Sequence, residues 1–174
     1  MTEYAIILYF DGATKERFFE LMHLTADACG NSYMLDQKIP PHITVCYFKA
    51  DDYSAALELV NKKAITLKRE IISWPSLGAF VPHTLFAAPT LNEYLLNRCA
   101  DFNELLSERV SLVDYYRPFK WIPHSTLATR LTAEQLNKAF EAVSLKFTHI
   151  EGAITALSFV RCEPFSEIMV WPLK

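Results

Sequence analysis

Two short stretches of this sequence place a histidine and a threonine two residues apart. Residues 42–45 read His-Ile-Thr-Val and residues 124–127 read His-Ser-Thr-Leu, and each stretch follows a proline and opens a short apolar run. In an extended strand, residues two apart point to the same face of the sheet. The spacing therefore sets an imidazole beside a hydroxyl twice, which suits phosphodiester chemistry if both pairs face one cleft.

The four side chains divide this chemistry between proton transfer and charge stabilisation. Histidine has an ordinary pKa of about 6.5, so His42 and His124 can give or take protons near neutrality. One neutral imidazole can take a proton from an attacking water or hydroxyl, while one imidazolium protonates the leaving oxygen. The hydroxyls of Thr44 and Thr126 can donate hydrogen bonds to the non-bridging phosphoryl oxygens. We expect neither a metal nor a cofactor, and the sequence does not assign which histidine is the acid.

A single strand histidine is more often structural than catalytic, so either motif alone is a weak signal. A third copy of the spacing, His23 with Thr25, lies in a stretch of helical periodicity. In a helix an offset of two residues turns the side chains about 200° apart, so this copy is not expected to act. The other two copies share the preceding proline, the extended pattern and equivalent places in the two halves, which favours the functional interpretation.

The motif segments PPHITVCYF and IPHSTLATR resemble those of the two-histidine (2H) phosphoesterase superfamily, which includes bacterial proteins called 2′-5′ RNA ligase-like. The resemblance implies an α+β fold of two pseudo-symmetric lobes, each an antiparallel sheet with helices packed outside, around a central cleft. It implies that His42 and His124 form the acid–base pair and that Thr44 and Thr126 hold the phosphate. Superfamily members cleave or form 2′-linked or cyclic phosphodiesters without a metal.

The composition is that of a globular protein with a substantial core. Of the 174 residues, 51% are hydrophobic and 21% are charged, and the net charge is −3. We expect one bilobal domain over residues 1–174. Proteins that bind a long nucleic-acid duplex usually have an excess of basic residues, and this chain has no such excess. The expected partner is therefore a nucleotide, a short oligonucleotide or an RNA end.

Cysteine usage and hydropathy suggest a location inside the cell. The four cysteines are widely spaced, which predicts reduced thiols in place of disulfides or a zinc site. The sequence shows neither a signal-peptide pattern nor an apolar stretch long enough to span a bilayer. We expect a cytoplasmic monomer with no membrane partner.

Periodicity and turn residues predict a similar order of elements in both halves. Strands are expected at residues 4–10, 42–48, 65–73, 77–81, 84–88, 124–129, 145–150, 154–162 and 167–171. Helices are expected at about 14–29, 51–62, 92–109 and 132–143, the last opening with a capping box of Thr132 and Gln135. The repeated order of helix, loop, motif strand and helix suggests a duplication.

Further residues could hold the rest of a substrate. Strand alternation would put Cys46 and Phe48 on the face of the first motif, and Arg130 on the face of the second. Arg130 could then reach a phosphate, with a surface salt bridge as the equal alternative. The segment 115–121 mixes aromatic and basic residues, so Tyr115 and Trp121 could stack on a base. The alternative is a loop whose rings cap the core.

The sequence therefore predicts a phosphodiesterase that hydrolyses 2′,3′-cyclic phosphates or 2′-5′ phosphodiester bonds of nucleotides or RNA ends. Two alternatives stay open. One is a binding module that holds a nucleotide or RNA end without turnover, and the other is an ATP-independent, reversible 2′-5′ RNA ligase. No G-x-x-x-x-G-K-[ST] loop is present, which disfavours an ATP-dependent ligase.

Overall fold

The fold was obtained as a computed structural model that covers residues 1–174. The strands are β1 (Thr2–Phe10), β2 (His42–Ala50), β3 (Glu70–Trp74), β4 (Ser76–Phe80), β5 (Thr84–Ala88), β6 (Ser111–Leu112), β7 (Ser125–Ala128), β8 (Ile150–Arg161) and β9 (Ser166–Pro172). The helices are α1 (Gly12–Cys29), α2 (Tyr33–Asp36), α3 (Ser54–Ala64), α4 (Glu93–Leu106), a 3₁₀ turn η1 (Asp114–Tyr116) and α5 (Ala133–Ser144).

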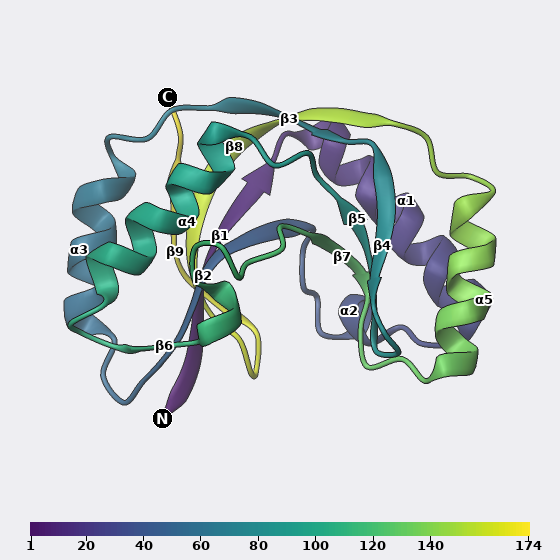
Figure 1. The fold of residues 1–174 in the computed structure, drawn as a ribbon, viewed down its shortest axis with the longest axis horizontal. Coiled ribbons are helices and arrows are strands. Elements are labelled where there is room, and N and C mark those ends of the chain that lie inside the picture. The colour runs from purple at the N-terminus through teal and green to yellow at the C-terminus, as the bar shows by residue number, and fades with distance from the viewer.

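The strands form two antiparallel sheets, one in each lobe. The larger sheet has the order β3-β8-β1-β2-β6, with β9 also paired to β8, and the smaller sheet has the order β4-β5-β7. Figure 1 shows the lobes side by side, with α3 and α4 on the outer side of the large sheet and α1 and α5 on the outer side of the small one. This α+β architecture confirms the predicted fold class.

Neither lobe corresponds to one half of the chain. Strands β3 and β4 are separated only by Pro75, yet β3 pairs in the large sheet and β4 in the small one. Helix α1 follows β1 of the large sheet but packs on β7 and α5. Helix α4 follows β5 of the small sheet but packs on β2. Each lobe is therefore built from both halves, although the predicted order of elements does repeat along the chain.

The alternation of strand residues and local caps explain the main elements. On β1, Tyr4, Ile6, Leu8 and Phe10 are buried in one apolar cluster that includes residues of both sheets. Asp11 caps α1 by accepting the Thr14 N–H at 2.9 Å, which satisfies a free donor at the helix start. The predicted capping box of α5 is present in full. No helix of the chain has both the length and the apolarity needed to cross a membrane.

Two predicted strand segments are wrong because no partner strand is available to them. Residues 145–149 follow α5 without strand structure, since the pairing of β8 with β3 starts only at Ile150 opposite Trp74. Residues 65–69 also lie outside any strand, and β3 begins at Glu70 opposite Ile154. From Ala156 onward that edge of β8 is taken by β9. Apolar periodicity does not contain this information about pairing.

Candidate active site

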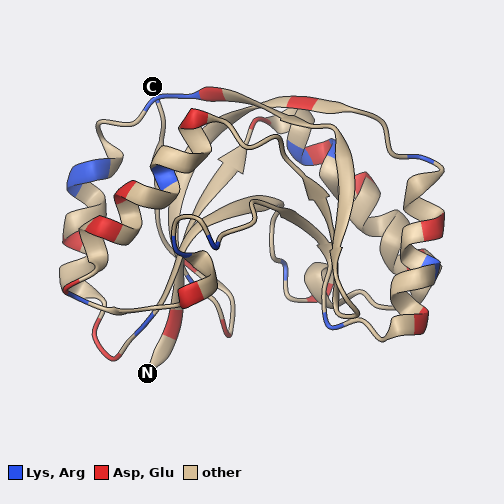
Figure 2. Cartoon of the chain, viewed as in Figure 1, with Lys and Arg blue, Asp and Glu red and all other residues tan.

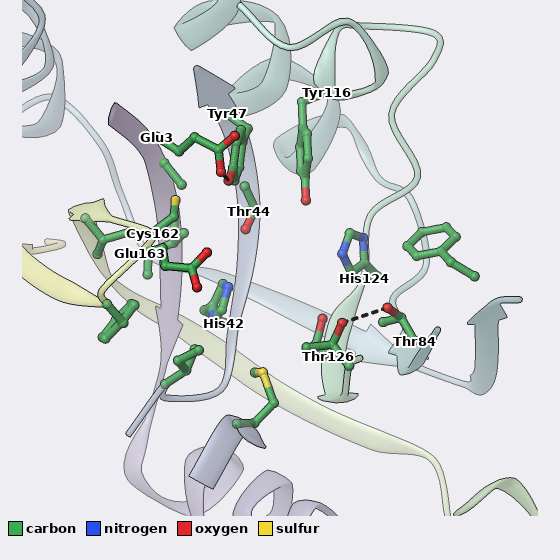
Figure 3. A pocket seen from close by; sticks show the side chains of 18 of the residues that line it. Glu3, His42, Thr44, Tyr47, Thr84, Tyr116, His124, Thr126, Cys162 and Glu163 are labelled. Atoms are coloured by element: carbon green, nitrogen blue, oxygen red, sulfur yellow. Dashed lines mark hydrogen bonds between the residues drawn. The ribbon is translucent and has the colours of Figure 1, made fainter. Parts of the chain in front are cut away.

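All seven residues predicted to act in catalysis or binding line a single cavity of about 620 Å³. They are His42, Thr44, Tyr115, Trp121, His124, Thr126 and Arg130. Strand β2 carries His42 and Thr44, while His124 immediately precedes β7, which carries Thr126. Figure 3 shows the two imidazoles facing one another across the space between the motif strands, with a threonine near each.

A β-bulge follows the threonine of each motif. Along β1 the pairing passes from Thr44 to Cys46 and skips Val45. Along β5 it passes in the same way from Thr126 to Ala128 and skips Leu127. One extra residue reverses the faces to which the following side chains point. The two motifs therefore share a backbone irregularity as well as a sequence pattern.

These bulges correct the predicted face of the first motif strand. Cys46 and Phe48 are fully buried in the core and do not line the cavity. The residue five positions after each histidine lines it instead, namely Tyr47 in β2 and Thr129 just beyond β7. Arg130 lines the cavity from a left-handed position with φ of 59°, beyond the end of its strand.

Each histidine is oriented by the backbone two residues before it. His42 Nδ1 lies 2.7 Å from the carbonyl oxygen of Pro40, and His124 Nδ1 lies 2.8 Å from that of Ile122. A carbonyl oxygen can only accept, so Nδ1 donates in both rings. Nε2 is then the unprotonated nitrogen of each neutral imidazole, available to take a proton from a ligand.

Burial keeps both histidines neutral in the ligand-free protein. It lowers the pKa of His42 to about 4, against the opposing effect of the Pro40 carbonyl and with a small further lowering from His124. Burial also lowers the pKa of His124, and the Ile122 carbonyl again opposes the shift. A phosphate anion between the rings would favour the charged form and raise the pKa of either one. The arrangement can therefore supply a base directly and an acid once an anion is bound.

The comparison with known proteins identifies the family of the chain. The sequence model of the 2′-5′ RNA ligase superfamily matches residues 21–163, which is most of the chain. The chain belongs to this superfamily. A comparison with curated proteins by sequence gave no match.

Solved structures share the fold of this superfamily member at low sequence identity. E. coli LigT in complex with 3′-AMP aligns with a TM-score of 0.68 at 10% identity, over 99% of this chain and 98% of LigT. The protein TT0787 of Thermus thermophilus aligns with a TM-score of 0.66 at 14% identity, over 98% and 97% of the two chains. Usb1 of Kluyveromyces marxianus aligns with a TM-score of 0.51 at 10% identity, over 99% and 98%.

The aromatic segment of this 2′-5′ RNA ligase superfamily member splits into exposed and buried rings. Tyr115 is 66% exposed, whereas Trp121 is only 8% exposed and packs in the core cluster. Trp121 therefore has little surface for stacking, as the alternative of a core-capping loop implies. Sequence reasoning missed Tyr116 and Tyr47, whose rings stack at 5.2 Å. Only the composition of segment 115–121 pointed to Tyr116, and the bulge concealed Tyr47.

Two phenylalanine rings contact His124, and a pair of threonine hydroxyls also lies in this part of the site. Phe80 meets the His124 ring edge-on at 4.9 Å, and Phe86 lies at 5.3 Å. The hydroxyls of Thr84 and Thr129 hydrogen-bond to each other at 3.0 Å. None of these residues was predicted, since they reach the site only through the pairing of β4, β5 and β7.

Opposite charges are paired around the cavity of this superfamily member. Arg130 donates to Glu163 at 2.9 Å and lies over the ring of Tyr33 at 4.1 Å. It therefore forms the salt bridge that the sequence left as an alternative, and it also lines the cavity. Lys49 contacts Glu3 at 2.9 Å. Figure 2 shows most charged residues on the outer helices and loops, with few on the strands of the two sheets. No group of three His, Cys, Asp or Glu side chains gathers as a metal site would require.

Proposed function

We propose that this protein is a metal-independent phosphodiesterase that hydrolyses 2′,3′-cyclic phosphates or 2′-5′ phosphodiester bonds of nucleotides or RNA ends. The observation that supports this proposal most directly is the orientation of the two histidines. Each Nδ1 is hydrogen-bonded to a backbone carbonyl, so both Nε2 atoms are available to a ligand in one cavity. Membership of the 2′-5′ RNA ligase superfamily supports chemistry on this type of bond.

The reaction divides between the two imidazoles. One neutral ring takes a proton from water at Nε2 as the water oxygen attacks phosphorus. The bond from phosphorus to the 2′ or 3′ oxygen breaks, and the other histidine, as imidazolium, gives its proton to that leaving oxygen. Each proton transfer typically contributes about 10²–10⁴ in rate. Thr44 and Thr126 donate to the non-bridging oxygens, where negative charge increases in the transition state.

The cavity favours a small ligand or a chain end. Its volume of about 620 Å³ lies in the range of roughly 300–1,000 Å³ usual for small-molecule sites. Its two cations, Arg130 and Lys120, are already paired with Glu163 and Asp114. Paired cations offer little free positive charge to the phosphates of a long nucleic acid. The complex of LigT with 3′-AMP supports a nucleotide as the class of ligand. The exposed ring of Tyr115 is available to stack on its base.

The test is hydrolysis of the four nucleoside 2′,3′-cyclic monophosphates in EDTA, with separation of the 2′- and 3′-phosphate products. Wild type is compared with His42→Ala, His124→Ala and the control His23→Ala, whose side chain is exposed on α1. We expect turnover in EDTA that either motif substitution abolishes and that the control retains. Activity that survives both motif substitutions would show that the active site lies elsewhere.

Reversible 2′-5′ RNA ligation is the second candidate, because the superfamily carries that activity in its name. With an RNA 5′-hydroxyl in place of water as the attacking group, the same two proton transfers would join it to a cyclic phosphate. The bond from phosphorus to the 3′ oxygen breaks, and the imidazolium protonates that oxygen. Joined 2′-5′ product that accumulates without ATP would favour this activity. Binding of 3′-AMP without turnover of any cyclic nucleotide or 2′-5′-linked dinucleotide would favour a binding module.

A further inference from the structure

Tyr116 lies over the first motif although it belongs to the loop that precedes the second. The backbone N–H of Val113 donates to the Tyr47 carbonyl at 3.0 Å, which fixes this loop against β2. The Tyr116 ring stacks on Tyr47 at 5.2 Å with an angle of 18° between the planes. The centre of the same ring lies 6.4 Å from that of His124. Figure 3 shows its hydroxyl pointing into the space between Thr44 and His124.

The backbone of Tyr116 is held from helix α4. The side-chain amide of Asn103 donates to the Tyr116 carbonyl at 3.0 Å and to the Cys99 carbonyl at 2.8 Å. Asn103 is only 5% exposed, and a buried amide is costly to leave without partners. The position of the tyrosine is therefore set by a buried hydrogen-bond network within the protein.

The ring of Tyr116 is held by Tyr47 of β2, whereas its backbone is held by α4. Its stacking partner Tyr47 donates its hydroxyl to Glu3 at 2.6 Å, and Glu3 is in turn bound by Lys49 at 2.9 Å. These contacts restrict the rotation of Tyr47 and hence the plane on which Tyr116 rests. A donor fixed before the substrate arrives needs no reorganisation during the reaction, which is the requirement for stabilising a transition state.

The hydroxyl of Tyr116 is suited to donate a hydrogen bond and not to transfer a proton. Burial raises the pKa of this phenol well above its ordinary value, with a smaller opposing effect from the nearby Thr44 hydroxyl. The group therefore stays protonated across the range in which the histidines titrate. It lines the cavity, so its proton can reach a bound ligand.

We propose that Tyr116 is a third hydrogen-bond donor to the phosphoryl group, acting beside Thr44 on one non-bridging oxygen. The inference rests on the proposed phosphodiesterase function and assigns a further residue to the same site. At the second motif Thr129 occupies the position that Tyr47 has in the first, so no tyrosine stands there to support another ring as Tyr47 supports Tyr116. The two non-bridging oxygens are consequently held by different sets of donors.

The first test compares Tyr116→Phe, which keeps the stacked ring, with the control Tyr53→Phe, which removes the hydroxyl of a tyrosine that packs on the core outside the cavity. Turnover of 2′,3′-cyclic nucleotides and affinity for 3′-AMP are measured for both. We expect Tyr116→Phe to lower kcat roughly tenfold to a hundredfold, with little change in KM or thermal unfolding. Affinity for 3′-AMP should fall roughly tenfold. A Tyr116→Phe variant that matches Tyr53→Phe in both measurements overturns the proposal.

The second test separates a donor from a residue that only shapes the cavity. Wild type and Tyr116→Phe are assayed with the Rp and Sp diastereomers of a nucleoside 2′,3′-cyclic phosphorothioate. Sulfur at the oxygen that Tyr116 contacts weakens that hydrogen bond, so removing the hydroxyl should shrink the thio effect for one diastereomer only. Equal changes for both diastereomers would assign Tyr116 a structural role and contradict the proposal.

The two proposals can fail separately. If wild type turns over no substrate but binds 3′-AMP, the phosphodiesterase proposal fails, and the affinity of Tyr116→Phe still decides the role of the phenol. Weaker binding than in Tyr53→Phe supports it, and equal binding overturns it. Wild-type protein that neither turns over substrate nor binds 3′-AMP or inorganic phosphate overturns both.

Discussion

His42 and His124 are oriented in the same way, each by a hydrogen bond from Nδ1 to the carbonyl oxygen two residues earlier, at 2.7 and 2.8 Å. The proline between the histidine and that carbonyl has a fixed φ, which helps hold the carbonyl under the ring. Both rings thereby have the same tautomer. A pair of equivalent rings allows the acid and the base to exchange roles between the forward and the reverse reaction.

The pH dependence of kcat/KM should be a bell whose maximum lies below about pH 6.5. The productive free enzyme needs one neutral and one charged imidazole, so its population peaks between the two pKa values. Burial lowers the pKa of His42 to about 4 and also lowers that of His124, which moves the peak to the acid side of the ordinary histidine value. The check is a profile from about pH 3 to 9 with a 2′,3′-cyclic nucleotide, which spans both limbs, with His23→Ala as control. A flat or single-limbed profile would contradict the two-histidine assignment.

Replacing Thr44 or Thr126 by valine should lower kcat by roughly 10–100-fold, because valine keeps the shape and removes the donor. The matched control is Ser125→Ala, one residue from Thr126 on the opposite face of β7. Ser125 is fully buried and accepts the Trp74 indole N–H at 3.1 Å. Its loss should cost about 1–3 kcal/mol of unfolding free energy while kcat is retained. If kcat fell as far in Ser125→Ala as in the threonine variants, the assignment of Thr44 and Thr126 as phosphoryl donors would be refuted.

Arg130 and Glu163 should affect substrate binding in opposite directions. Their ion pair is largely exposed, so neither Arg130→Gln nor Glu163→Gln should change the melting temperature appreciably. Arg130→Gln should raise KM for a 2′,3′-cyclic nucleotide that also carries a 5′-phosphate. Glu163→Gln should lower it, because the guanidinium is released from its carboxylate. The measurement is KM with and without the 5′-phosphate, and equal effects on both substrates would exclude Arg130 as a phosphate contact.

Gly152→Ala should destabilise the fold, whereas Gly12→Ala should not. A Cβ on Gly152 would lie 1.8 Å from Thr14 Oγ1, while one on Gly12 has nothing within 4 Å. Thr14 also donates to the Asp11 carboxylate that caps α1, so it cannot move without disturbing the helix start. We expect a loss of about 1–3 kcal/mol for Gly152→Ala, measured by urea unfolding. Equal unfolding midpoints for the two variants would contradict the close packing of β8 on α1.

The sequence by itself determined the features that depend on neighbouring residues. The two motifs, their prolines, the capping box of α5 and the repeated order of elements all follow from local spacing and propensity. The residue resemblance to the 2H phosphoesterases rested on the same segments, and the family match over residues 21–163 confirms it.

The tertiary structure decided everything that depends on which strand lies beside which. The bulges at Val45 and Leu127 are defined by the pairing with β1 and β5. Because of the bulge at Val45, Tyr47 lines the cavity in place of Cys46. Residues 145–149 have strand periodicity but no partner. Tyr116 reaches the first motif because its loop crosses to the opposite lobe. Hydrogen bonds between distant segments set these positions, and one sequence contains no local signal for a partner that lies far along the chain.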